Sequence, residues 1–337
     1  MRLATLLFCL ASPLAFAQQA VTGGAGLDYM PSVIRDADGT LRVAFERLNP
    51  STLSGDLWTT HSNDGGATWS TPTVAVATTS NERHPALVPL ADGSYVLFFL
   101  HGASAASSFR IHRATSPDGM AFSDLGAIAL GWATGGEINP HVVRHPDGTL
   151  TMSYQRLGSG GSYVAQSTDG GATWDTLRTP IAADGLLPRI AFRASDGKYL
   201  ATYQVGPSPL ALYAKTTTNV RDWSAAPVDF ATDGDNHDSL PVVMPDDAFA
   251  VFYIHADGSQ YDVYSRRSTD GVAFEASLAH VVGDADDVEP HPLVGTSSQK
   301  VELYWGSAAA GSNDYDILRL VDVAVSEAIF DDGFDAP

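Results

Sequence analysis

Short runs rich in hydrophobic and β-branched residues recur along the chain, each followed by a polar turn and a second such run. The turn is Asp-Gly in the first four units and Asp246-Asp247 in the fifth, and second runs cover 40–45, 95–100 and 149–154 in the first three. This pattern predicts β-hairpins. The first run of each of the six units begins at a proline: Pro31, Pro85, Pro140, Pro188, Pro241 and Pro290.

A second pattern sets the spacing of these units. The eight residues Ser62 to Trp69 return almost unchanged as Ser167 to Trp174, and three shorter copies begin at Ser116, Thr217 and Ser268. The copies keep a period of about 50 residues, which is typical of propellers and other repeat folds. A third run precedes each copy and a fourth follows it. The sequence therefore predicts an all-β six-bladed propeller with four antiparallel strands in each blade.

The repeated motif has the composition of a tight turn. Its aspartate can accept backbone N–H groups, its glycines allow positive φ, and its aromatic residue can pack beneath the turn. We therefore interpret Asp64 and Asp169 as structural residues rather than catalytic acids.

The motif resembles the Asp box of the BNR repeat family, the sialidase-like six-bladed propellers, and the resemblance covers residues 25–320. The sixth unit lacks the box. Its outer strand is expected to come either from residues 18–24 or from Asp322 to Ser326, closing the ring.

The two ends of the chain are predicted to lie outside the propeller domain of residues 18–326. Residues 1–17 have the basic start, apolar run and small-x-small ending of a signal peptide, with cleavage near Ala17. We therefore expect a secreted protein, extracellular or periplasmic, without a membrane span. Residues 327–337 form an acidic tail, and the only cysteine, Cys9, lies in the signal peptide.

The net charge limits the kinds of molecule that the protein is expected to bind. A formal charge of −20 makes nucleic acid a poor partner. We expect a monomer that binds an extracellular glycan or polysaccharide and needs no cofactor.

Candidate chemistry gathers in the segments that lead into each first strand and leave each second strand, because these meet around the axis on the face opposite the motif turns. Their acids, bases and arginines suit acid–base catalysis. The candidate catalytic residues are Tyr29, Glu82, Arg83, Glu137, Asp238 and Glu289. The candidate substrate-binding residues are Glu46, Arg47, His84, Asn139, His141, Arg189, His237 and His291.

The resemblance also implies a test for the activity. Sialidases of the family carry Arg-Ile-Pro on the first inner strand, and that arginine grips the substrate carboxylate. The matching stretch here is Leu27 to Pro31, with Tyr29 in the arginine position. Arg83, one blade later, is the nearest equivalent, while Arg47 and Arg189 match no family arginine.

These features favour a secreted, sialidase-like glycoside hydrolase, although not a sialidase proper. Two alternatives stay open: a glycan- or protein-binding propeller without catalysis, and a lyase acting on a uronate-containing polysaccharide. Four axial histidines, His84, His141, His237 and His291, could also ring a metal ion, but their spacing of one blade is what any repeat imposes. We predict no metal site.

Overall fold

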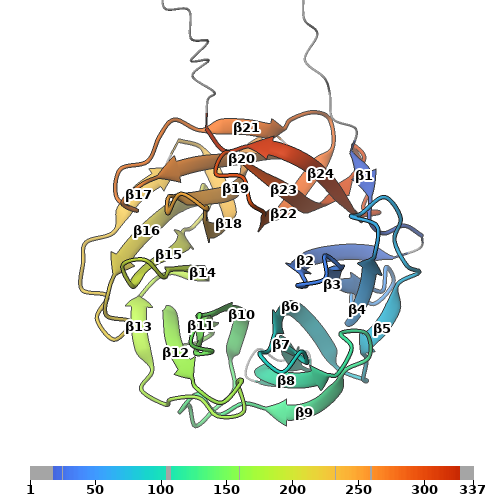
Figure 1. The fold of residues 1–337 in the computed structure, drawn as a ribbon, viewed down its shortest axis with the longest axis horizontal. Helices are drawn as coiled ribbons and strands as arrows, with labels where there is room; N and C mark the ends of the chain where they lie inside the picture. Colours follow the sequence, from blue (N-terminus) through green and yellow to red (C-terminus); the bar gives the residue numbers. More distant parts are fainter. Residues whose placement is uncertain are drawn as a thin grey trace, which may run out of the picture.

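The computed structural model describes residues 18–326 except 25, 104–107, 159, 232 and 259. The predicted signal peptide (1–17) and acidic tail (327–337) lie outside the described residues. The described chain forms 24 strands in six four-stranded sheets, arranged as a ring in Figure 1. The six-bladed propeller is confirmed.

The blades follow one another along the chain. Blade 1 contains β2 (Leu27–Arg35), β3 (Leu41–Leu48), β4 (Gly55–Ser62) and β5 (Thr73–Val76). Blade 2 contains β6 (Asn81–Pro89), β7 (Tyr95–Gly102), β8 (Arg110–Ser116) and β9 (Ser123–Ala127). Blade 3 contains β10 (Glu137–Arg144), β11 (Leu150–Arg156), β12 (Ser162–Ser167) and β13 (Thr179–Ala182).

The other half of the ring repeats this order. Blade 4 contains β14 (Leu186–Arg193), β15 (Lys198–Val205), β16 (Ala211–Thr217) and β17 (Val228–Ala231). Blade 5 contains β18 (Asp235–Val243), β19 (Phe249–Asp257), β20 (Gln260–Ser268) and β21 (Leu278–Val281). Blade 6 contains β22 (Asp286–Val294), β23 (Lys300–Ala308), β24 (Asp316–Ala324) and β1 (Gln19–Ala20).

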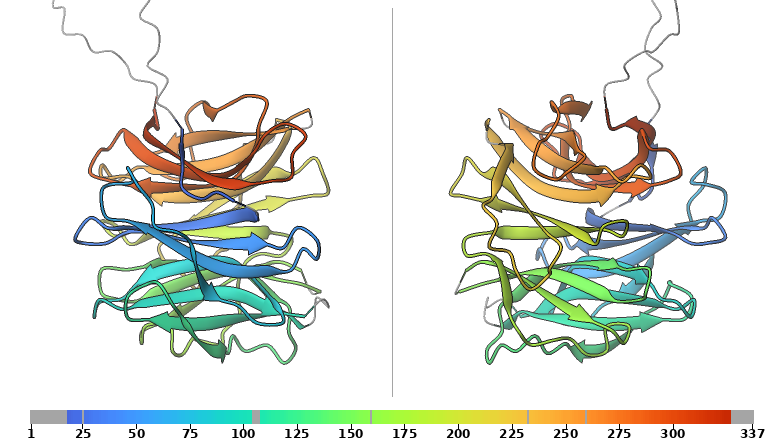
Figure 2. Two further views of the ribbon diagram at one scale, coloured as in Figure 1. Left: turned by 90° about the vertical axis from the view of Figure 1, so that its right-hand side faces the viewer. Right: turned by 60° about the vertical axis from the view of Figure 1, so that its left-hand side comes forward.

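The ring is closed by pairing of an N-terminal strand with the C-terminal blade. β1 pairs with β24 in antiparallel register, Gln19 opposite Arg319, and so forms the outer strand of blade 6. This confirms the first of the two predicted closures. Figure 2 shows the two ends of the described chain at this edge of the ring. The described residues include no helix of the length and apolarity that crossing a membrane requires.

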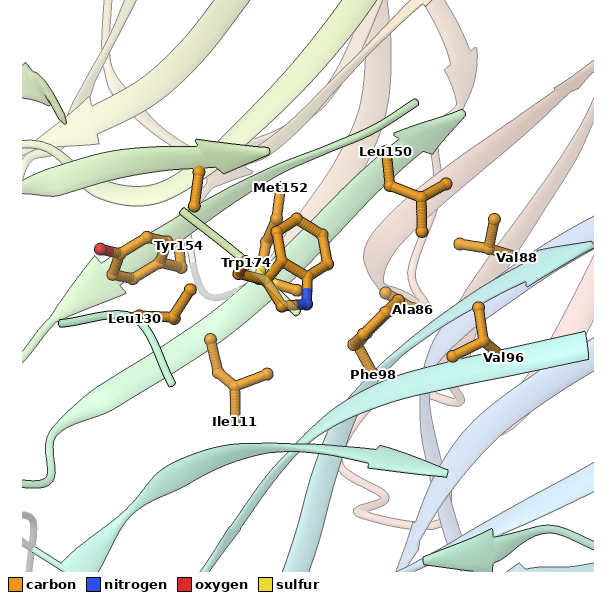
Figure 3. Close-up of a cluster of buried hydrophobic side chains, with 11 residues drawn as sticks. Ala86, Val88, Val96, Phe98, Ile111, Leu130, Leu150, Met152, Tyr154 and Trp174 are labelled. Carbon is orange, nitrogen blue, oxygen red and sulfur yellow. The ribbon is translucent and has the colours of Figure 1, made fainter. Parts of the chain in front are cut away.

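The hydrophobic core consists of six buried clusters, and each joins two neighbouring blades. Figure 3 shows the cluster between blades 2 and 3, where Phe98 and Ile111 meet Met152 and Trp174. The rings of Phe98 and Trp174 pack edge to face, 5.4 Å apart. Because each cluster needs both of its blades, apolar burial stabilises the closed ring and not the single blade.

The two full Asp boxes are turns between the third and fourth strands of blades 1 and 3, as predicted. The carboxylate of Asp169 accepts from the backbone N–H of Thr173 (2.9 Å), from the Thr173 hydroxyl (2.6 Å) and from Ser167 Oγ (2.8 Å). These bonds lower the pKa of Asp169 to about 2. Gly171 has φ of 80°, and a Cβ there would lie 2.3 Å from the Phe98 ring, so glycine is required by both turn and packing.

Candidate active site

The first strand of every blade has a bulge near its start, at the equivalent position in all six blades. Its pairing register with the second strand shifts between Tyr29 and Ser32 in blade 1 and at the equivalent point in the other five blades. One residue in each bulge has left-handed backbone, with φ between 46° and 56°: Met30, His84, Asn139, Leu187, Asp238 and Glu289. This conformation costs a non-glycine residue roughly 1–2 kcal/mol. The bulges re-aim side chains at the axial end of each blade.

The bulges also correct the alignment of blade 5 made from the sequence. A proline follows the left-handed residue in five blades, as Pro85 follows His84. In blade 5 the residue after Asp238 is Ser239, and Pro241 lies two positions further along the strand. The proline pattern therefore placed blade 5 out of step by two residues.

A cavity of about 510 Å³ runs along the axis and is lined by the first strands of all six blades. This size is typical of small-molecule sites. Six of the predicted site residues line the cavity: His84, His141, Arg189, Asp238, Glu289 and His291.

Glu289 is the carboxyl group most strongly affected by this environment. Burial raises the pKa of Glu289 well above its ordinary value, and the nearby carboxyl groups of Glu46 and Asp238 raise it further. One carboxyl oxygen accepts a hydrogen bond from the backbone N–H of Met30 at 2.5 Å. Glu289 therefore retains a proton at pH values where an ordinary glutamate has lost it.

Asp238 and Arg189 both line the cavity, and their opposite charges interact. Burial raises the pKa of Asp238, while the positive charge of Arg189 opposes that rise. Within the described part of the chain, no carboxylate lies within ion-pair distance of the Arg189 guanidinium, whose Nη1 donates to the carbonyl of Pro188 at 3.3 Å. The pocket thus offers a cation without a tight partner next to two acids.

The cavity histidines are neutral. Burial lowers the pKa of His84 and of His291 to about 4, and that of His141 well below its ordinary value. His141 Nδ1 accepts from the backbone N–H of Ile190 at 3.2 Å. His84 Nδ1 is buried and has no hydrogen-bond partner among the described residues. A ligand group in the cavity would satisfy it.

Glu46 and Arg83 support the cavity from blades 1 and 2. Glu46, fully buried, accepts from Arg83 Nε (3.2 Å), Arg83 Nη2 (2.8 Å) and the backbone N–H of His84 (2.9 Å). Burial raises the pKa of Glu46, but the Arg83 charge and these hydrogen bonds outweigh it and hold the pKa below its ordinary value. The Arg83 charge is therefore already matched by a carboxylate.

Tyr29 stands beside this pair, next to the cavity lining. Its ring lies 4.6 Å from the ring of Tyr315. Burial, followed by the charges of Glu289 and Glu46, raises the pKa of Tyr29 to about 12. The phenol keeps its proton at neutral pH and can donate a hydrogen bond.

The remaining predicted site residues contact other partners and do not line the cavity. Glu82 accepts from Thr78 and lies 3.4 Å from His101, and Glu137 pairs with Arg110 and Arg156. Asn139 donates to Gln155, Arg47 forms a bidentate pair with Asp28, and His237 lies 2.9 Å from Asp235. The predicted cluster thus separates into an axial group and a set of pairs between strands.

The alternative of a metal ion held by the four axial histidines finds no support in the geometry. Within the described part of the chain, no set of three ligand atoms from His84, His141, His237 and His291 lies close enough to share an ion.

Two residues near the cavity escaped the sequence reasoning. Met30 lines the cavity and occupies in blade 1 the left-handed position that His84 occupies in blade 2. Aligning each residue that precedes the bulge proline would have found it. Tyr315, which packs on Tyr29, lies just before β24 and outside the repeat pattern, so no sequence signal pointed to it.

The sequence was compared with models of known protein families and with curated proteins. The family model of the BNR repeat-like domain matches residues 28–228. Among curated proteins, none matches the chain.

Several solved structures share the fold. A Dyadobacter fermentans protein of unknown function is 15% identical with a TM-score of 0.74, and the match covers 91% of this chain and 98% of that one. The Hadza microbial sialidase is 17% identical with a TM-score of 0.70, over 88% and 66% of the two chains. A Penicillium chrysogenum α-L-arabinanase complexed with arabinobiose is 16% identical with a TM-score of 0.65, over 89% and 94%. At these identities the likeness shows the fold alone.

Proposed function

The chain belongs to the family of BNR repeat-like domains, and we propose that it is a glycoside hydrolase acting on an extracellular glycan through the axial cavity. One observation carries the proposal. Two partly buried carboxyl groups, Glu289 and Asp238, line the same cavity, and the charge of Asp238 raises the proton affinity of Glu289. Cleavage of a glycosidic bond normally uses such a pair, one protonated and one ionised.

The different environments of the two acids support a different role for each. Burial and two neighbouring carboxyl groups raise the pKa of Glu289 well above its ordinary value, whereas burial raises the pKa of Asp238 against the opposing positive charge of Arg189. We therefore assign Glu289 as the general acid. Asp238 is the carboxylate that acts as base or nucleophile on the opposite step.

The reaction balances with these two groups. Glu289 gives its proton to the glycosidic oxygen as the bond from that oxygen to the anomeric carbon breaks. Water supplies the hydroxyl that remains on the anomeric carbon. With Asp238 as the base, Asp238 takes the proton released from that water, and proton exchange with solvent returns both groups to their starting states. With Asp238 as the nucleophile, the ionised Glu289 takes that proton, and the bond from Asp238 to the anomeric carbon breaks as the water adds.

The surrounding residues orient the sugar. The neutral imidazoles of His84, His141 and His291 offer hydrogen bonds to hydroxyl groups. Arg189 is the cavity's cation, while Arg83 is matched by Glu46. Since Tyr29 occupies the position of the sialidase arginine, we propose a glycan other than a sialoside. The sialidase and arabinanase folds among the neighbours support a carbohydrate ligand.

The test is turnover on a panel of sialosides, uronate polysaccharides and neutral glycans, measured by product chromatography. The proposal expects cleavage of at least one glycan, abolished by Asp238→Asn and largely retained by Glu137→Ala, which removes a carboxylate outside the cavity. Glycan binding without any turnover would establish the non-catalytic alternative. An unsaturated uronate product would establish the lyase alternative.

A further inference from the structure

A second cluster of metal-ligating side chains lies in blade 2, away from the axial cavity. One ligand atom from each of His101, His112 and Asp124 lies within 4.8 Å of the others. We propose that this cluster binds a divalent transition-metal ion of the Zn²⁺ type. The site is independent of the proposed hydrolase activity.

The strand register brings the three side chains to one face of the blade. Phe99 on β7 pairs with His112 on β8, so His101, two positions along β7, lies on the same face as His112. The two imidazole rings stack with centroids 4.1 Å apart. On β9, the carboxylate of Asp124 approaches His112 Nδ1 to 3.0 Å.

A fourth strand supplies a further carboxylate. Glu82 on β6 lies opposite His101 on β7, and its Oε1 is 3.4 Å from His101 Nε2. All four strands of blade 2 thus contribute one group to the cluster. Two imidazoles and a carboxylate, with a fourth position for water or Glu82, form a common zinc ligand set.

The charge around the cluster favours a cation. Glu82 accepts hydrogen bonds from Thr78 and approaches His101, and Asp124 accepts from the backbone N–H of Gly126 and approaches His112. Among the described residues, no Arg or Lys lies within ion-pair distance of either carboxylate. Carboxylates beside ring nitrogens also orient metal-bound histidines in many proteins.

Binding requires one local adjustment. A ring nitrogen offers its lone pair in the ring plane, and the rings are nearly parallel, with 18° between their planes. One ring must therefore turn for both to share an ion. His101 is the suitable one, because its side chain is 23% exposed and its approach to Glu82 is long at 3.4 Å.

The ion would cross-link the exposed outer strand β9 to the buried strand β7. The sequence contains a single cysteine, Cys9, so no intrachain disulfide can do this. An ion at 100 times its dissociation constant is expected to raise the melting temperature by about 4 °C for a domain of this size.

The experiment uses the mature protein after treatment with a chelator. Calorimetric titration with Zn²⁺ should give one site, and Co²⁺ should give the visible absorption of a tetrahedral complex with nitrogen ligands. His112→Gln is expected to weaken Zn²⁺ binding at least 10-fold. Asp124→Asn, on the exposed edge strand, should also weaken Zn²⁺ binding and keeps the test valid if the His112 variant fails to fold.

The matched control is His61→Gln, which removes a histidine of blade 1 outside the cluster and should leave Zn²⁺ affinity unchanged. Absence of binding at 1 mM Zn²⁺, on the order of a thousand times weaker than a micromolar site, would overturn the proposal. So would unchanged affinity and an unchanged Co²⁺ spectrum in both His112→Gln and Asp124→Asn.

Discussion

The buried ion pair between Glu46 and Arg83 gives the sharpest prediction on stability. Glu46→Gln keeps the size of the side chain but removes the charge that accepts two guanidinium N–H groups and the backbone N–H of His84. Breaking a buried pair typically costs 3–5 kcal/mol. Here the Arg83 side chain is 35% exposed and can recover some hydration. We therefore expect a loss of about 2–3 kcal/mol in the free energy of unfolding.

The assay is urea unfolding at pH 7, followed by tryptophan fluorescence, in a double-mutant cycle with Arg83→Met. The double variant should be more stable than the sum of the single losses predicts, since it leaves no unpaired charge. As a control, Asp322→Asn breaks the exposed pair with Lys300 and should cost less than about 0.5 kcal/mol.

The same pair has a defined pH dependence. The pKa of Glu46 is lower in the folded protein than in the unfolded chain, because Arg83 and the hydrogen bonds outweigh the effect of burial. Its contribution is therefore complete above the unfolded pKa and disappears as pH falls through the folded pKa. The difference between the native protein and Glu46→Gln should shrink below about pH 4. A loss under 0.5 kcal/mol at pH 7, or additive single losses, would refute this reasoning.

Three further predictions concern other parts of the molecule. Glu289→Gln should raise the free energy of unfolding at pH 8 more than at pH 4, because a raised folded pKa makes the native protein lose stability as pH rises above the unfolded pKa; urea midpoints at both pH values check this. Asp169→Ala should cost about 1–2 kcal/mol through its lost turn hydrogen bonds while leaving kcat unchanged, and a large fall in kcat with intact folding would contradict the structural interpretation. The rings of His84 and His291 should stay neutral from pH 8 to pH 5, so a titration midpoint near 6.5 in ¹⁵N NMR spectra would be inconsistent with their burial.

The fold followed from the sequence because its signal is repeated. Two full copies of the Asp box and three shorter ones fix the phase of the strands, and each copy has local turn chemistry that needs no tertiary context. Closure by the N-terminal strand was one of two alternatives, since a strand as short as β1 (Gln19–Ala20) has no periodic pattern of its own.

The site was predictable only in part. His84, Glu289 and His291 were placed correctly relative to a proline, and they line the cavity. Glu82 was drawn from the same segment, but the bulge between Arg83 and Ala86 breaks the alternation of strand side chains, so counting from the proline does not give its direction.

Blade 5 shows the second limit. Asp238 was selected as a candidate although the blade was aligned on Pro241. The polar segment before that proline is short, so an alignment error of two residues still left Asp238 inside it. The charge states could not be predicted at all. They depend on burial and on neighbours from other blades, as Glu289 of blade 6 does on Glu46 of blade 1.

Delivery of a proton from Glu289 to the departing sugar oxygen makes the rate depend on the leaving group in a way that the Glu289→Gln variant exposes. The measurement compares kcat of the native protein and Glu289→Gln on aryl glycosides with acidic and with weakly acidic phenol leaving groups. We expect kcat of the variant to fall about 10²–10⁴-fold on poor leaving groups and much less on activated ones, which need no protonation. Equal losses on both classes, or full activity of Glu289→Gln on poor leaving groups, would contradict it.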